Sequence, residues 1–352
     1  MPYERKIIND PVFGFINIPK GLLYDIVRHP LLQRLTRIKQ VGLSSVVYPG
    51  AQHTRFQHSL GAFHLMSEAI TQLASKGNFI FDSEAEAVQA AILLHDIGHG
   101  PFSHVLEDTI VKGVSHEEIS LMLMERMNKE MNGQLSLAIQ IFKDEYPKRF
   151  LHQLVSGQLD MDRLDYLRRD SFYTGVTEGN IGSARIIKML DVADDRLVVE
   201  SKGIYSIENF LTARRLMYWQ VYLHKTSVAY EKMLISTLLR AKEVELFASP
   251  ALRFFLYNDI NPTEFYNNPD CLENFIQLDD NDIWTALKVW STHTDKVLST
   301  LSTGMINRNI FKVEISSEPI SEDRKKELTL HISQQLGITL SEANYFVSTP
   351  SI

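Results

Sequence analysis

The stretch LLHDIGHGPFSH, from Leu93 to His104, places three histidines and one aspartate within twelve residues at the end of an apolar run. The run begins as AEAVQAAILLHD over residues 85–96, and its apolar positions share one helical face with His95. This pattern predicts a helix whose end presents an imidazole nitrogen and the carboxylate of Asp96 side by side. A pair of this kind at a helix end is suited to bind a metal.

Helical periodicity extends over most of the chain and predicts a mainly α fold. A capping box of Ser83 with Glu86 predicts where the helix before His95 begins, and Gly98 predicts where it ends. Further helices are expected at residues 21–42 with a break at Pro30, 57–76, 117–128, 134–142, 149–157, 160–170 and 207–247.

Short β-structure is expected at three places. Residues 1–20 are typical of a small strand pair, and residues 196–207 predict a hairpin around Ser201-Lys202-Gly203. The tail is expected to be a small α+β appendix, with strands at 311–316 and 345–349 on either side of a helix at 322–337. We therefore expect a mostly helical core over residues 1–250 and a second region, helical and small α+β, over 251–352.

Composition excludes several classes of protein. A net charge of −7 over 352 residues disfavours a general nucleic-acid binder, which needs a broad basic face. Cys271 is the only cysteine, so an intrachain disulfide or a cysteine-rich zinc site is excluded and a reducing compartment fits. The first ten residues include the charged Glu4, Arg5, Lys6 and Asp10, where a signal peptide would need an apolar core, and no run approaches eighteen apolar residues. We expect a cytoplasmic protein without membrane association.

A divalent metal held by histidine and carboxylate suits a hydrolase of phosphate esters. Beside His95 and Asp96, His58 and Asp162 are candidate sources of two further ligands. Ligand hardness fits Mn, Fe(II), Mg or Zn. Simpler structural roles compete: the His-Asp pair could be a capped helix end. Asp160 could cap its own helix, and Asp165 could pair with Arg168 or Arg169.

Five segments together resemble the HD-domain phosphohydrolases, and within them the deoxynucleoside triphosphate triphosphohydrolases (dNTPases). They are RIKQVG (37–42), YPGAQHTRFQHSLG (48–61), LLHDIGHGPFSH (93–104), SHEE (115–118) and DMDRLDYLRRDSFYTG (160–175). The resemblance covers about residues 5–245. It extends to the bacterial broad-specificity branch and to the catalytic core of the vertebrate sterile-alpha-motif/HD dNTPase.

The resemblance implies roles for residues at matching positions. The implied ligands of one metal are His58, His95, Asp96 and Asp162. The implied substrate contacts are Gln40, Arg55, His99, His104, Arg163, Tyr166 and Asp170, with Gln40 and Arg55 near the deoxyribose and α-phosphate and Asp170 near the 3′-hydroxyl. His116 with Glu117 resembles the acid–base pair, and His99 and His104 are further catalytic candidates. His104 and His116 stay open as the proton donor.

The implied function is hydrolysis of dNTPs to deoxynucleoside and tripolyphosphate by water attack at the α-phosphorus. The alternatives are another HD-type phosphohydrolase, such as a nucleotidase, a cyclic-nucleotide phosphodiesterase or an alarmone hydrolase. A nucleotide-sensing or nucleic-acid-binding module is the alternative from a different class. The resemblance also implies a homo-oligomer, and some relatives need a nucleotide activator.

Overall fold

The computed structural model describes residues 5–102, 105–106, 109–316 and 318–349, and these form two compact units. The first unit contains the residues up to Val41 together with Tyr48–His99 and Ser115–Val221. The second contains Gly42–Val47, Gly100–Val114 and the residues from Tyr222 onward. Each unit therefore combines stretches that are separate in the sequence.

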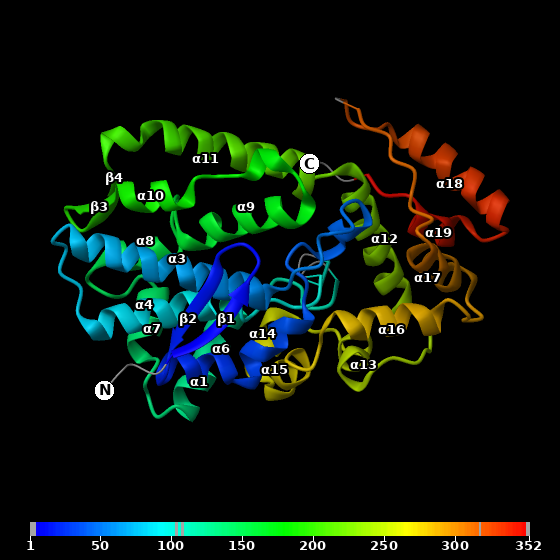
Figure 1. Cartoon of the computed structure of the whole chain (residues 1–352). Coiled ribbons are helices and arrows are strands. Elements are labelled where there is room, and N and C mark those ends of the chain that lie inside the picture. Colours follow the sequence, from blue (N-terminus) through cyan, green and yellow to red (C-terminus); the bar gives the residue numbers. More distant parts are fainter. Residues whose placement is uncertain (1–4, 103–104, 107–108, 317, 350–352) are drawn as a thin grey trace. The chain divides into compact units, whose positions relative to one another are not determined.

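The first unit is a helical bundle built around α3 (Arg55–Ser75). This helix packs against α4 (Asp82–Leu94) and α9 (Met161–Thr174), and Figure 1 shows it between them. The remaining helices of the unit are α1 (Leu22–Arg28), α2 (Pro30–Gln33), α6 (His116–Glu130), α7 (Ser136–Phe142), α8 (Arg149–Val155), α10 (Ser183–Met189) and α11 (Ile204–Met217), with 3₁₀ turns at Arg34–Arg37, Thr177–Gly179 and Ser201–Gly203. Because α3 is buried along most of its length, it forms the centre of this core.

Side-chain caps fix where the two central helices begin. Thr54 caps α3: its hydroxyl accepts from the N–H of Gln57, and the Gln57 side chain accepts from the N–H of Thr54. Asp160 caps α9 by accepting from the N–H of Arg163, as expected for its structural role. These caps place His58 and Asp162 near the N-terminal ends of neighbouring helices.

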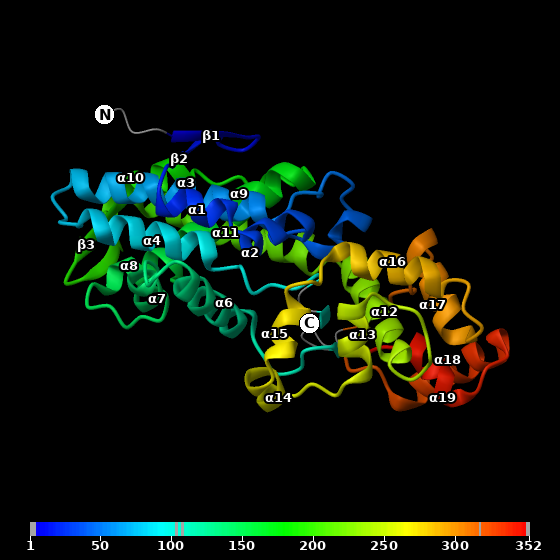
Figure 2. The ribbon, with the colours of Figure 1, turned by 90° about the horizontal axis from the view of Figure 1, so that it is seen from below.

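Two antiparallel hairpins complete the first unit. Strands β1 (Arg5–Asp10) and β2 (Gly14–Pro19) pair with Ile8 opposite Ile16. Ile16 and Ile18 are fully buried while Phe15 and Asn17 are exposed, and β2 contacts α3 (Figure 2). The second hairpin joins β3 (Leu190–Ala193) to β4 (Arg196–Val199).

The second unit is also helical. Its helices after residue 222 are α12 (Lys225–Ala241), α13 (Pro250–Tyr257), α14 (Pro262–Asn267), α15 (Pro269–Phe275), α16 (Asp280–Trp290), α17 (Lys296–Asn307), α18 (Glu322–Leu336) and α19 (Leu340–Ala343), and 3₁₀ turns lie at Gly42–Val46 and Asn344–Phe346. Helix α17 packs on both α12 and α16, and Trp290 is fully buried in this core.

The mainly α fold with a short hairpin is confirmed, as are the strand pair near the N-terminus and the tail helix. The tail strands predicted at 311–316 and 345–349 are wrong, because the described residues of the tail contain helices and turns but no strand. The predicted helix 207–247 is interrupted by a π turn at Tyr218–Tyr222. No helix among the described residues is long and apolar enough to cross a bilayer. The expected boundary near residue 250 stays a prediction.

Candidate active site

Three predicted metal ligands converge from different parts of the first unit. Nε2 of His58 lies 3.1 Å from Oδ1 of Asp162 and 3.3 Å from Nε2 of His95. The ligand atoms of these three residues lie within 4.8 Å of one another, which is close enough to hold one metal ion. The fourth predicted ligand, Asp96, has Oδ1 3.4 Å from Nε2 of His95 and Oδ2 3.7 Å from Nε2 of His58. We call these four residues the ligand cluster; its two imidazoles and two carboxylates fit a divalent cation.

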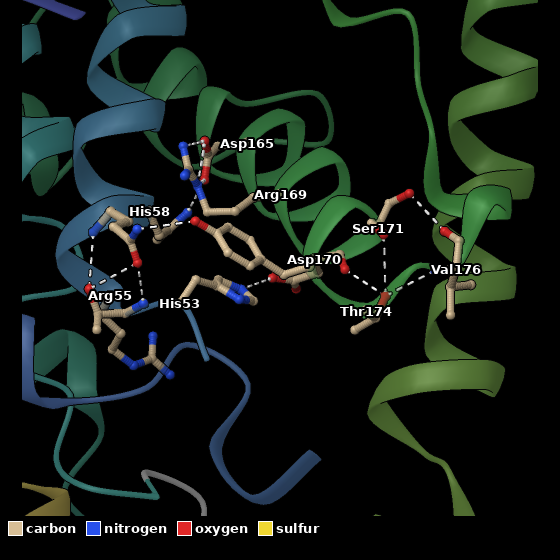
Figure 3. Close-up of polar contacts among 12 residues, drawn as sticks. His53, Arg55, His58, Asp165, Arg169, Asp170, Ser171, Thr174 and Val176 are labelled. Carbon is tan, nitrogen blue, oxygen red and sulfur yellow. Dashed lines mark hydrogen bonds and ion pairs between the residues drawn. The ribbon is translucent and has the colours of Figure 1, made fainter. Parts of the chain in front are cut away.

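Both imidazoles of the ligand cluster are oriented by hydrogen bonds at the opposite ring nitrogen. Nδ1 of His95 lies 2.7 Å from the carbonyl oxygen of Ile92. Nδ1 of His58 lies 2.6 Å from Oδ2 of Asp165, and Figure 3 shows the His58 ring directed toward α9. Since the carbonyl and the carboxylate accept, each Nδ1 carries the hydrogen, and Nε2 is the atom that can bind a metal.

Carboxylates control the charge of the cluster. Burial opposes protonation of His58, but hydrogen bonds and charges from Asp162 and Asp165 prevail and raise the pKa of His58 to about 10. Burial likewise opposes ionisation of Asp162, but its hydrogen bonds to His58 and His95 lower its pKa. The cluster therefore attracts positive charge, and a metal that binds there competes with a proton.

Asp96 connects the ligand cluster to Arg55 and His99. Nη1 of Arg55 donates to Oδ2 of Asp96 at 2.6 Å, and Nε2 of His99 lies 3.3 Å from Oδ1. Nε of Arg55 is buried and has no hydrogen-bond partner among the described residues. Burial and the charge of Arg55 lower the pKa of His99 to about 3, so this ring is neutral near pH 7. A buried guanidinium with an unused donor is suited to bind a phosphate oxygen.

The predicted acid–base pair lies next to His99. The ring of His116 stacks on that of His99, with centroids 3.9 Å apart and planes 18° apart. Ser115 caps α6, so His116 is its first residue, and Oε1 of Glu117 lies 3.2 Å from its Nε2. A Cβ at Gly98 would lie 2.2 Å from the carbonyl oxygen of His116. Only glycine therefore allows α6 to approach the His-Asp turn this closely.

The residues expected near the sugar are also brought together. The N–H of Gln40 donates to the carbonyl of His53, and Oε1 of Gln40 is buried without a partner among the described residues. Nε2 of His53 lies 2.7 Å from Oδ1 of Asp170, with both side chains buried (Figure 3). The ring of Tyr173 stacks on that of His53, with centroids 4.4 Å apart.

Arg163 and Tyr166 follow the predicted ligand Asp162 along α9, one and four residues after it. Arg163 forms an ion pair with Asp160 and donates to the carbonyl of Gly157. Tyr166 is half-buried, and burial with the nearby charge of Asp162 raises its pKa. His104 lies outside the described residues.

Sequence reasoning did not identify His53, the contact of Asp165 with His58 or the contact of Arg169 with Asp10. The predicted pairing of Asp165 with Arg169 is confirmed, whereas Arg168 contacts Ser183 instead. His53 could have been suspected from its place in a histidine-rich segment. The other contacts join residues far apart in the sequence and carry no local pattern.

Two family models match the chain. The HD domain matches residues 55–170, and the HD associated region matches residues 181–269. A crystal structure of a phosphohydrolase from Bacteroides thetaiotaomicron superposes with a TM-score of 0.98 at 94% identity, covering 99% of this chain and 88% of that one. The chain belongs to the HD-domain phosphohydrolase family.

Two further proteins are similar to this HD-domain phosphohydrolase over most of its length. It is 31% identical to the uncharacterized protein YwfO of Bacillus subtilis, over 88% of this chain and 72% of that protein. It is 30% identical to a deoxynucleoside triphosphate triphosphohydrolase SAMHD1 homolog of Dictyostelium discoideum, over 88% of this chain. The chain spans 60% of the length of the Dictyostelium protein.

Proposed function

We propose that this HD-domain phosphohydrolase is metal-dependent and hydrolyses dNTPs to deoxynucleoside and tripolyphosphate. The observation that carries the proposal is the ligand cluster with the buried guanidinium of Arg55 bonded to one of its carboxylates. Polyphosphate cleavage needs positive charge at several phosphate oxygens, and this arrangement can supply it. The name of the Dictyostelium relative supports a dNTP as the substrate.

The proposed cofactor is one divalent cation, Mn, Fe, Mg or Zn, held by His58, His95, Asp96 and Asp162. When bound, such a cation neutralises charge on the phosphate and activates water. The two histidines offer Nε2 because their Nδ1 atoms are already engaged. Asp96 also bonds Arg55, so one carboxylate fixes both the proposed ligand set and the proposed phosphate-binding guanidinium.

Neighbouring side chains would position the substrate. Arg55 would bind the α-phosphate through its unused Nε, and Gln40 would bind near the deoxyribose through its unused Oε1. Asp170, held by His53, would accept from the 3′-hydroxyl. On α9, Arg163 and Tyr166 would contact the phosphates.

The reaction would begin with water attack at the α-phosphorus. The bond from phosphorus to the 5′-oxygen breaks, its electron pair stays on that oxygen, and a proton must reach it to form the nucleoside hydroxyl. His116, with Glu117 beside it and its ring stacked on that of the neutral His99, is a described candidate for this proton transfer. His104 is a further candidate from the sequence.

The test is product analysis with the full chain. Protein incubated with each dNTP, ribonucleotides, monophosphates and cyclic nucleotides, with Mn²⁺ or Mg²⁺, is expected to yield deoxynucleoside and tripolyphosphate from dNTPs. The double variant His95→Ala/Asp96→Ala is expected to lose both activity and bound metal. Release of orthophosphate or pyrophosphate instead would contradict the triphosphohydrolase reaction but leave the metal site standing.

Three wider expectations accompany the proposal. We propose a homo-oligomer, and a nucleotide activator remains part of the proposal because the dNTPase resemblance implies it. The cytoplasmic location stays a prediction from the single cysteine.

A further inference from the structure

A chain of buried ionic contacts leads from the N-terminal hairpin to His58. Oδ2 of Asp165 lies 2.6 Å from Nδ1 of His58. Arg169 contacts both oxygens of Asp165 through Nε and Nη2, the shortest distance being 2.9 Å. Nη1 of Arg169 donates to Oδ2 of Asp10, at the end of β1, at 2.7 Å. None of these four side chains is more than 4% exposed.

Asp10, the residue of the hairpin in this series of contacts, also binds backbone N–H groups. Oδ1 of Asp10 accepts from the N–H groups of Val12 and Phe13, both at 2.9 Å, while Oδ2 accepts from Arg169. The ring of Phe13 lies 5.6 Å from the Arg169 guanidinium. A single carboxylate therefore fixes both the turn of the hairpin and one end of Arg169.

A contribution to folding stability does not by itself explain why Asp165, Arg169 and Asp10 are buried. Removing charged groups from water costs several kcal/mol per ion, and a buried pair is often no more stabilising than apolar side chains of the same volume. An ionic chain that ends on a ring nitrogen of a proposed metal ligand has another use, because a carboxylate at that nitrogen orients the ring and strengthens it as a ligand.

We infer that Asp165, Arg169 and Asp10 are positioning residues that keep Nε2 of His58 directed toward His95 and Asp162, so that the β1–β2 hairpin contributes to metal affinity. The inference rests on the role of His58 as a metal ligand in the proposed function. Asp165 acts directly on His58, Arg169 holds Asp165, and Asp10 holds Arg169. The effect of Asp10 must then pass through Asp165.

The experiment measures affinity for Mn²⁺ by competition with a chromophoric chelator in the full chain. The variants are Asp165→Asn, Asp10→Asn and the double variant. Asp295→Asn is a matched control: Asp295 likewise pairs with an arginine, Arg240, while its other contact caps a backbone N–H, that of Leu298. Circular dichroism and thermal melting with EDTA show whether each metal-free variant is folded.

Asp165→Asn is expected to weaken Mn²⁺ binding about 10- to 100-fold, the usual range for a residue behind a ligand histidine. Asp10→Asn is expected to weaken it less, and to add nothing further in the Asp165→Asn background. Asp295→Asn is expected to bind Mn²⁺ like the parent protein.

Three results would overturn the inference: parental affinity in folded Asp10→Asn, an equal loss in Asp295→Asn, or additive effects in the double variant. If Asp165→Asn does not fold, the comparison of Asp10→Asn with Asp295→Asn still decides. Failure of the parent protein to bind Mn²⁺ or another divalent cation would instead contradict the proposed metal site. Parental Mn²⁺ binding without dNTP hydrolysis would contradict only the proposed substrate.

Discussion

At the scale of single residues, Gly61 shows how closely α3 and α9 approach each other. A Cβ at this position would lie 1.9 Å from Oδ1 of Asp165 and 2.1 Å from Nη2 of Arg169. Neither side chain can turn aside easily, since both are fully buried and Arg169 is bonded at both ends. The contact between Asp165 and Arg169 therefore leaves no room for a side chain at position 61 of α3.

Gly61→Ala is expected to lower the free energy of unfolding by about 1–3 kcal/mol, the usual cost of an extra methyl group in a packed core. Gly182→Ala is the control, because its φ is −78° and its new Cβ would meet only the Cβ of Arg185, at 3.9 Å. We expect that control to change stability by less than about 1 kcal/mol. Urea unfolding followed by circular dichroism measures both, and equal stabilities would contradict the close contact.

The ligand cluster could be predicted at this scale, but its support could not. His58, His95, Asp96 and Asp162 lie in recognisable segments, and the structure brings them together. His58 and Asp165 are 107 residues apart, and Asp10 and Arg169 are 159 apart. Contacts over such separations depend on the packing of whole helices, which no local pattern encodes.

At the scale of elements, the capping interactions show why the start of α4 was predicted at the wrong residue. The box predicted at Ser83 and Glu86 is wrong: α4 begins at Asp82, and Glu84 accepts from the N–H of Phe81 instead. The tertiary contacts of Glu84 decided this register. Its carboxylate also accepts from the hydroxyl of Tyr146 at 2.6 Å and from Nζ of Lys148 at 2.7 Å.

These contacts predict a pH-dependent contribution of Glu84 to stability. Burial opposes its ionisation, but the bonds from Lys148, Tyr146 and Phe81 lower its pKa in the folded state. A lowered folded-state pKa gives stability that is complete above the unfolded value, near 4.5, and is lost as the pH falls through the folded value.

Glu84→Gln is therefore expected to cost about 1–2 kcal/mol at pH 7. The difference from the parent should shrink steadily as the pH is lowered below about 4. Urea unfolding between pH 3 and 7 measures it, with the exposed Glu86→Gln as the control on the same helix. A difference that stays constant with pH would contradict the ionic role of Glu84.

The β-elements show a similar limit. The second hairpin turns at Asp194-Asp195, both with positive φ of 49° and 58°, rather than at Ser201-Lys202-Gly203. A two-residue hairpin turn with positive φ at both positions is one that aspartate can adopt, so the Asp194-Asp195 pair was a turn signal in the sequence. Residues 311–316 and 345–349 have a strand-like sequence pattern. A strand also needs a partner strand to pair with, and the described residues of the tail include none.

At the scale of the whole molecule, helix α11 carries exposed apolar side chains. Ile204, Tyr205, Leu211 and Trp219, just beyond its end, are between 55% and 79% exposed. Ile204 and Leu211 are seven residues apart and share a face. Neighbouring exposed apolar groups are typical of a contact surface, which makes α11 the place to test the proposed homo-oligomer.

Leu211→Glu is expected to shift the protein toward smaller species in analytical ultracentrifugation, because a charge there opposes apolar association. Leu330→Glu, at an exposed leucine of α18, is the control and is expected to sediment like the parent protein. A parent that sediments as a monomer at micromolar concentration would contradict the homo-oligomer, and an unchanged Leu211→Glu variant would remove α11 from its interface.

The division into units could not be predicted, because each unit combines stretches that are separate in the sequence. The residues of the candidate site are also far apart in the sequence, and this affects the order in which they are synthesised. A ribosome releases His58 of α3 and His95, directly after α4, long before Asp162, Asp165 and Arg169 of α9, so a nascent chain carries an incomplete set of proposed ligands until about half of its 352 residues are made. Binding of the proposed metal would therefore follow synthesis of this half, and a chain truncated before α9 would lack Asp162 from the proposed ligand set.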